Sequence, residues 1–196
     1  MKTAIIFHSV CGNDYLLART FFEAFIKRGQ KDTELYRVSD DDWKDQLDLP
    51  EATRKHLSDM FSLPVATPEV LLDKDLILMG APTYFGNVSA EMKAFMDATS
   101  CHWFEGKLAG KKLVAFTSYG NSESGGSLCL QSIHTYGQHM GMISVSIPTT
   151  TVPGKISSPY GVLYNSQGKY GELLDKDTIK LIEKFSDYLL KIPASR

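Results

Sequence analysis

The sequence lacks the marks of a membrane-bound, secreted or nucleic-acid-binding protein. No apolar run approaches the roughly 20 residues that a membrane-spanning helix needs, and the N-terminal run 1–7 is too short for a signal peptide. With 21 Lys and Arg against 23 Asp and Glu, the formal net charge is −2, so there is no basic excess to attract nucleic acid or anionic lipid. We predict a cytoplasmic protein whose partners include neither nucleic acid nor a membrane.

Cysteine is scarce, and metal-binding patterns are missing. The three cysteines are scattered and odd in number, which argues against a disulfide framework and against a cysteine metal site. His134 and His139 do not have the spacing of a helical zinc site, and we interpret His134 as a surface residue of a helix. The acidic triplet 40–42 is interpreted as a solvated turn, so no metal site is predicted. The cysteines are Cys11, which we interpret as a packing residue, Cys101 and Cys129.

What the sequence does contain is the pattern of one α/β domain over residues 1–196. Short apolar runs rich in β-forming residues predict buried strands, and segments with apolar residues at helical spacing predict helices between them. Five alternations of strand and helix imply a parallel sheet with helices on both faces. Strands are expected at 4–7, 33–38, 76–81, 113–117 and 142–147. Helices are expected at 14–29, around 50–61, at 89–99, at 126–140 and from 175 onwards, with a loop at 148–171.

In such a sheet, ligands bind beyond the carboxyl ends of the strands. The segment 9–14 follows the first strand and leads directly into a helix, whose N-terminus attracts phosphate. Gly12 lets the backbone approach a ligand closely. A plain helix cap is the alternative, because neither the GxGxxG nor the Walker pattern is present.

Two further strand ends carry residues suited to a planar ring. The segment 81–87 places two aromatic residues and an amide before the next helix, and aromatic faces pack on flat rings. Its alternative is a rigid turn that covers the core. The small polar segment 118–126 suits a second edge of the same ring, and its alternative is a flexible surface loop. Together, the three strand ends favour a flavin site.

Several motifs then match one protein family in order along most of the chain. They resemble the WrbA-type NAD(P)H:quinone oxidoreductases of the flavodoxin-like superfamily. The resemblance implies a doubly wound, five-stranded parallel sheet in the order 2-1-3-4-5, bound FMN, and a homodimer or homotetramer. The matching residues are 64–69 (PVATPE), 80–87 (GAPTYFGN), Met92, Phe95, Asp97, Trp103, Gly106, Leu108, Gly110, Lys111, 116–118 (FTS), 139–142 (HMGM) and 159–161 (PYG).

The resemblance also implies which residues form the site. The loop after the first strand would hold the FMN phosphate, and the loops after the third and fourth strands would hold the isoalloxazine ring. Three candidate catalytic residues follow: Tyr84 and Trp103 as aromatic walls, with Trp103 reaching toward a neighbouring subunit's flavin, and His139 near the flavin. The expected cofactor-binding residues are Ser9, Val10, Cys11, Gly12, Asn13, Asp14, Pro82, Thr83, Tyr84, Phe85, Gly86, Asn87, Ser118, Tyr119, Gly120, Asn121, Ser122, Glu123 and His139.

Three positions depart from the family pattern. Cys11 stands where the family usually has an aromatic residue, and Tyr84 stands where it usually has Arg. Asp14 puts a carboxylate at the helix N-terminus, where it suits the helix dipole but would repel a phosphate. We expect its side chain to point to solvent while its N–H binds the phosphate. These positions leave open the choice between NADH and NADPH.

The resulting hypothesis is an FMN enzyme in which NAD(P)H donates a hydride to flavin N5 and a quinone-like acceptor then takes two electrons in the same slot. A flavodoxin-type electron carrier and a binding protein that has lost its flavin are the alternatives. A receiver domain would need acidic residues at the ends of strands 1 and 3, where the sequence has His8-Ser9 and Ala81-Pro82.

Overall fold

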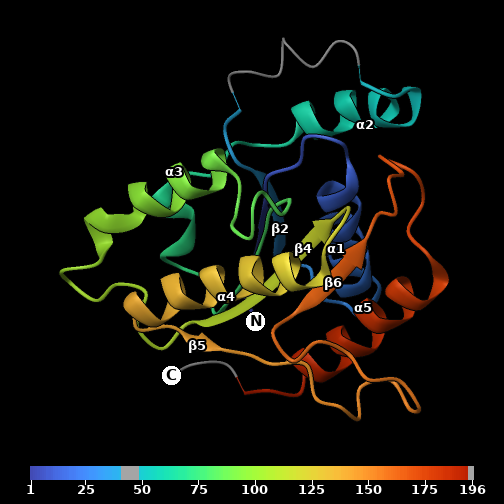
Figure 1. The fold of residues 1–196 in the computed structure, drawn as a ribbon. Coiled ribbons are helices and arrows are strands. Elements are labelled where there is room, and N and C mark those ends of the chain that lie inside the picture. The colour runs from blue at the N-terminus through green and yellow to red at the C-terminus, as the bar shows by residue number, and fades with distance from the viewer. Residues whose placement is uncertain (41–48, 194–196) are drawn as a thin grey trace.

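A computed structural model describes residues 1–40 and 49–193. Within them, six parallel strands form one sheet in the order β2-β1-β3-β4-β5, with β6 also paired to β4 (Figure 1). The expected order is therefore confirmed. The strands are β1 (Thr3–Phe7), β2 (Thr33–Arg37), β3 (Leu76–Gly80), β4 (Lys112–Tyr119), β5 (Ile143–Ser144) and β6 (Val162–Asn165).

Helices lie between the strands, close to the expected positions. The α-helices are α1 (Asn13–Lys27), α2 (Glu51–Ser62), α3 (Ala90–Ala98), α4 (Glu123–His139) and α5 (Lys176–Leu189). Two short 3₁₀ turns, η2 (Pro68–Leu71) and η3 (Thr99–His102), flank β3 and α3. Across residues 1–40 and 49–193, no helix is both long and apolar enough to cross a bilayer.

The sheet has a hydrophobic core on each face, because successive side chains of a strand point to opposite sides. From β1, Ile5 and Phe7 pack in the core that includes residues of α1 and α5. Ala4 and Ile6 pack in the other core, which includes residues of α3 and α4. The doubly wound α/β fold is thus the one that the sequence predicts, and it aligns the carboxyl ends of the strands at one edge.

The fifth strand differs from the expected strand 142–147. β5 pairs only with the first residues of β4, Lys112 and Leu113, before the chain leaves the sheet. The chain returns as β6 beside Phe116–Tyr119, so the expected loop 148–171 contains a strand. Gly161 permits this return: its φ is 138°, and a Cβ there would overlap the backbone oxygen of Ala115.

His134 joins the two ends of the chain segment between β5 and β6. Its Nε2–H donates to the carbonyl of Tyr160 at 2.6 Å, and its Nδ1 accepts from the Ser144 hydroxyl at 3.0 Å. The side chain is buried, and burial lowers its pKa against the opposing effect of the Tyr160 hydrogen bond. The interpretation of His134 as a surface residue is therefore wrong, because the returning chain covers this face of α4.

Candidate functional site

A cavity of about 260 Å³ opens at the carboxyl ends of β1, β3 and β4. Apart from two residues of the segment after β6, its lining comes from the three strand-end loops that the sequence predicts. The topology brings these loops together because parallel strands end at the same edge of the sheet. The lining residues are Val10, Cys11, Asn13, Asp14, Pro82, Thr83, Tyr84, Ser118, Tyr119, Gly120, Ser166 and Tyr170.

The loop after β1 ends in a helix terminus whose N-cap residue, Gly12, has no side chain to cap the first N–H groups. Gly12 precedes α1 with a φ of 85°, a left-handed conformation that favours glycine. Uncapped N–H groups and the helix dipole make such a terminus suited to an anion. In the same loop, the buried hydroxyl of Ser9 lacks a hydrogen-bond partner among the described residues, but it faces a separate small hollow beside Arg37.

Asp14 points inward, so the expectation that it faces solvent is wrong. Its side chain is 1% exposed, and its carboxylate accepts hydrogen bonds from the backbone N–H of Ser118 at 2.9 Å and from its hydroxyl at 2.6 Å. Burial raises the pKa of Asp14 from 3.8 to about 7, although Ser118 and the nearby His8 act in the opposite direction. The reason is tertiary: the start of α1 packs against the end of β4, where Ser118 offers two donors.

The loop after β3 is anchored to β4 and then makes a tight turn. Thr83 donates its N–H to the carbonyl of Ser118 at 2.9 Å, and its hydroxyl lies 2.9 Å from that of Thr117. Tyr84 and Asn87 exchange two backbone hydrogen bonds of 2.9 Å.

Between them, Phe85 and Gly86 have φ values of 50° and 79°, as a type I′ turn requires. A fully exposed phenylalanine in this strained conformation is typical of a functional turn rather than of a core cover. Beside it, Tyr84 is half exposed and forms an aromatic wall of the cavity. The partial burial of Tyr84 raises the pKa of its hydroxyl.

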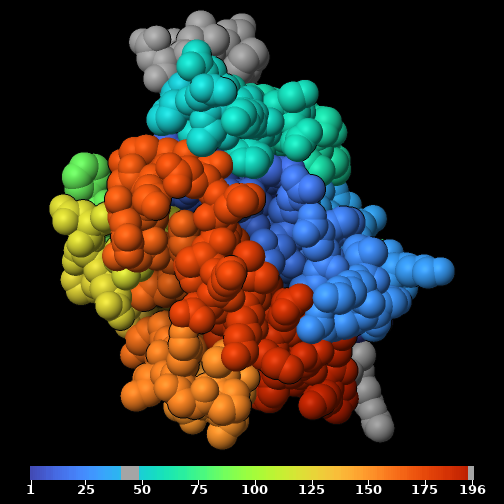
Figure 2. All heavy atoms as spheres, turned by 90° about the vertical axis from the view of Figure 1, so that its right-hand side faces the viewer, coloured from blue at the N-terminus to red at the C-terminus, as the bar shows by residue number. Residues whose placement is uncertain are grey.

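A segment after β6, residues 166–171, closes one side of the cavity and was not predicted as part of the site. Asn13 holds it by accepting from the N–H of Gly171 at 3.0 Å and donating to the carbonyl of Lys169 at 3.3 Å. His56 of α2 donates to the carbonyl of Gly171 at 2.9 Å. In Figure 2 this orange segment lies against the cyan α2. The one sequence signal is Tyr170 between Gly168 and Gly171, two glycines with positive φ.

Trp103 and His139 lie away from the cavity of their own chain. The indole N–H of Trp103 donates to the carbonyl of His139 at 3.0 Å. His139 is at the C-terminal end of α4, whereas the start of α4 follows the cavity loop after β4. His139 instead lines a hollow of about 420 Å³ between α3 and α4. The other expected cofactor residues that do not line the described cavity are Ser9, Gly12, Phe85, Gly86, Asn87, Asn121, Ser122 and Glu123.

Two cysteines have thiols that burial keeps protonated. Cys11 lines the cavity, and burial, followed by the charge of Asp14, raises its pKa. Burial raises the pKa of Cys129 to about 11. Neither thiol has the lowered pKa of a nucleophile, which favours the interpretation of Cys11 as a packing residue.

Comparison with known proteins identifies the family. The family model for NADPH-dependent FMN reductases matches residues 1–155. The chain belongs to this family. Its relatives include a Deinococcus radiodurans protein named NAD(P)H dehydrogenase (quinone), which is 30% identical over 90% of this chain and 88% of its own length. A Paracoccus denitrificans protein of the same name is 46% identical over 85 residues, which span 43% of this chain and 41% of that protein.

The fold is shared with solved structures at lower identity. The crystal structure of the flavodoxin, WrbA-like protein from Agrobacterium tumefaciens matches with a TM-score of 0.63 and 19% identity, over 95% of this chain and 92% of that one. The solved structure shows the shared flavodoxin-like fold, while the family model and the relatives confirm the expected resemblance to NAD(P)H:quinone oxidoreductases. The family membership makes FMN the cofactor to test against the cavity.

The residues at the cavity fit FMN. The uncapped start of α1 supplies N–H groups suited to a phosphate, and Tyr84 supplies an aromatic wall suited to a flat ring. Asp14 does not exclude a phosphate, because its carboxyl is turned toward Ser118 and its raised pKa leaves the carboxyl neutral about half of the time near pH 7. The donor set therefore has the chemistry that the family's cofactor requires.

Outside the cavity, the structure corrects one further expectation. Asp40 is not in a solvated turn: its side chain is 10% exposed and accepts a hydrogen bond from Nε2 of His8 at 3.3 Å. Asp41 and Asp42 lie outside the described residues.

Proposed function

We propose that this protein, as a single domain over residues 1–196, is an FMN-dependent oxidoreductase that uses NAD(P)H to reduce quinone-like acceptors. The observation that carries the proposal is the cavity at the carboxyl ends of β1, β3 and β4, with an uncapped helix terminus on one side and Tyr84 on another. Membership of the FMN reductase family and relatives named NAD(P)H dehydrogenase (quinone) support it.

Each loop has a separate task in this proposal. The backbone of residues 10–14 holds the phosphate at the start of α1, where N–H groups and the helix dipole favour negative charge. Thr83, Tyr84 and the segment 118–120 border the ring, and Tyr170 excludes water from the side closed by residues 166–171. When bound, FMN supplies the redox chemistry by taking a hydride from the nicotinamide and passing two electrons to the acceptor.

Asp14 contributes a proton store beside the cavity. With a pKa of about 7, its carboxyl holds a proton during about half of the time near neutral pH, and Ser118 fixes the position of both oxygens. The neutral carboxyl does not repel the phosphate, whereas the carboxylate that forms at higher pH does. Asp14 therefore makes cofactor binding depend on pH.

We propose further that Trp103 and His139 act at a contact between copies of the chain, in a homodimer or homotetramer. Trp103 is 58% exposed and its neighbour Phe104 is 91% exposed, which is more apolar surface than a solvated loop requires. The described cysteines are free thiols, which supports a reducing cytoplasm as the compartment.

The first experiment is a visible spectrum of the purified protein, with excess FMN added if it is colourless. NADH, NADPH and a benzoquinone are then added in turn. We expect flavin absorbance that falls with a nicotinamide, returns with quinone and cycles with steady consumption of the nicotinamide. Bound FMN without quinone turnover would favour an electron carrier. No uptake of excess FMN would refute the proposal.

A further inference from the structure

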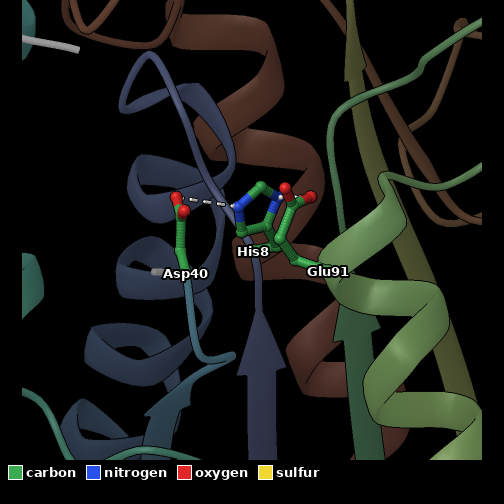
Figure 3. A group of neighbouring side chains, drawn as sticks. All are labelled: His8, Asp40 and Glu91. Carbon is green, nitrogen blue, oxygen red and sulfur yellow. Dashed lines mark hydrogen bonds and ion pairs between the residues drawn. The ribbon is translucent and has the colours of Figure 1, made fainter. Parts of the chain in front are cut away.

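Three side chains with metal-binding chemistry meet outside the cavity. His8 follows β1, Asp40 follows β2 and Glu91 lies in the first turn of α3 (Figure 3). One nitrogen or oxygen atom from each of the three lies within 4.8 Å of the others. The three residues are distant in sequence, and the order β2-β1-β3 at the sheet edge brings them together.

The imidazole of His8 lies between the two carboxylates. Its Nε2 is 3.3 Å from an Asp40 oxygen, and its Nδ1 is 3.6 Å from an oxygen of Glu91. The ring is 2% exposed, and within the described residues Nδ1 makes no hydrogen bond. If Nε2–H donates to Asp40, Nδ1 presents a lone pair to a carboxylate. A buried lone pair that faces a carboxylate is stable only with a proton or a cation between the two groups.

We propose that His8 Nδ1 and the Glu91 carboxylate bind a divalent transition-metal ion, while Asp40 orients the ring through Nε2–H. Two ligand atoms that each lie about 2.1 Å from a tetrahedral ion are about 3.4 Å apart, close to the 3.6 Å between Nδ1 and Glu91. A carboxylate that accepts the far N–H of a metal-binding histidine is a recurrent arrangement. The site therefore has two protein ligands and an orienting carboxylate.

The ligand types select the ion. One imidazole with carboxylate and no thiolate suits Zn²⁺ better than Mg²⁺, which prefers oxygen alone. Zn²⁺ should also bind more tightly than Mn²⁺. The Glu91 side chain is 30% exposed, which gives an entry path and room for water as further ligands.

The site lies close enough to the cavity to influence it. After the effect of burial, the charges of Glu91 and Asp40 are among those that raise the pKa of Tyr84 in the cavity wall. A bound cation would oppose these charges. The proposal does not depend on the oxidoreductase function, because the metal ligands are not residues of the cavity.

The test is calorimetric titration of chelator-treated, FMN-saturated protein with Zn²⁺, Mn²⁺ and Mg²⁺. We expect one Zn²⁺ site, weaker Mn²⁺ binding and no Mg²⁺ binding in the same range. Glu91→Gln should weaken Zn²⁺ binding at least roughly 10-fold, and Asp40→Asn by roughly 10- to 100-fold. Asp97→Asn is the matched control, because Asp97 lies on the same helix and pairs with Lys93 at the surface. It should bind Zn²⁺ as the unmodified protein does.

Two further readouts separate the site from ordinary surface binding. Zn²⁺ should raise the melting temperature of the unmodified protein and of Asp97→Asn clearly more than that of Glu91→Gln. Co²⁺ should give visible bands without thiolate charge-transfer absorption. Absence of saturable Zn²⁺ binding, equal affinity in Glu91→Gln, or thiolate bands from the cysteines would overturn the proposal.

Discussion

Asp14 and Ser118 are joined by two hydrogen bonds, at 2.9 Å from the backbone N–H and at 2.6 Å from the hydroxyl of Ser118. They connect the first turn of α1 to the end of β4, so a titratable carboxyl lies in the wall of the cavity. The acidic residue that the helix dipole favours at this position is thereby turned from solvent into the site.

Asp14 should make the protein less stable as the pH rises. Its pKa is about 7 in the folded protein and near the ordinary 3.8 in the unfolded chain, so the folded state binds the proton more tightly. This contribution is complete below about pH 4 and is lost as the pH rises through about 7, a difference of roughly 4 kcal/mol. Asp14→Asn should remove this loss, because an amide does not titrate in this range, while its oxygen accepts from the Ser118 N–H and its NH2 donates to the Ser118 hydroxyl. Melting curves of both proteins between about pH 5 and 8 test this. If the melting temperatures of the unmodified protein and of Asp14→Asn change with pH by the same amount, the prediction is wrong.

Gly161 should be the most sensitive position in the chain segment that leads to β6. Alanine there would overlap the backbone oxygen of Ala115, so Gly161→Ala should lose roughly 3 kcal/mol or more. Gly154→Ala is the matched control: its φ is also positive, at 75°, but no atom lies within 4 Å of the added Cβ, and the expected cost is about 1 kcal/mol. Urea unfolding measures both. Equal losses would mean that β6 does not pack closely on β4.

Bound FMN should protect the Cys11 thiol from alkylation. Its thiol lines the cavity and burial raises its pKa, so it should react with iodoacetamide more slowly than the exposed Cys101 at about pH 8. FMN should slow the reaction of Cys11 further and leave Cys101 unaffected, while Cys129 should stay unmodified in the folded protein. Peptide mass spectrometry over time measures all three. If the alkylation rate of Cys11 is the same with and without FMN, the cofactor does not bind in this cavity.

Tyr84 and His139 should affect FMN binding differently. Tyr84→Leu removes an aromatic wall of the cavity and should weaken FMN binding roughly 2- to 10-fold. His139→Ala should leave FMN affinity unchanged at protein concentrations where the chain is monomeric, since His139 does not line that cavity. An effect that appears only as copies associate would support the proposed subunit contact. Flavin fluorescence quenching, with gel filtration at matched concentrations, distinguishes these cases.

The sequence by itself determined the architecture and the location of the site. Short apolar runs such as 76–81 are too short for helices, which favours buried strands, and their alternation with helical segments favours a parallel sheet. Because parallel strands end at one edge, the segments 9–14, 81–87 and 118–126 were expected to meet there. This reasoning uses local patterns and one topological rule.

Tertiary structure alone decided how side chains far apart in sequence face one another. Asp14 is buried because Ser118 lies opposite it, and Asn13 bonds to Gly171, 158 residues further along the chain. His8 meets Asp40 and Glu91 only through strand order. Burial and partners set the pKa of a carboxyl and the ligands open to a metal, and both come from long-range packing that no local pattern encodes.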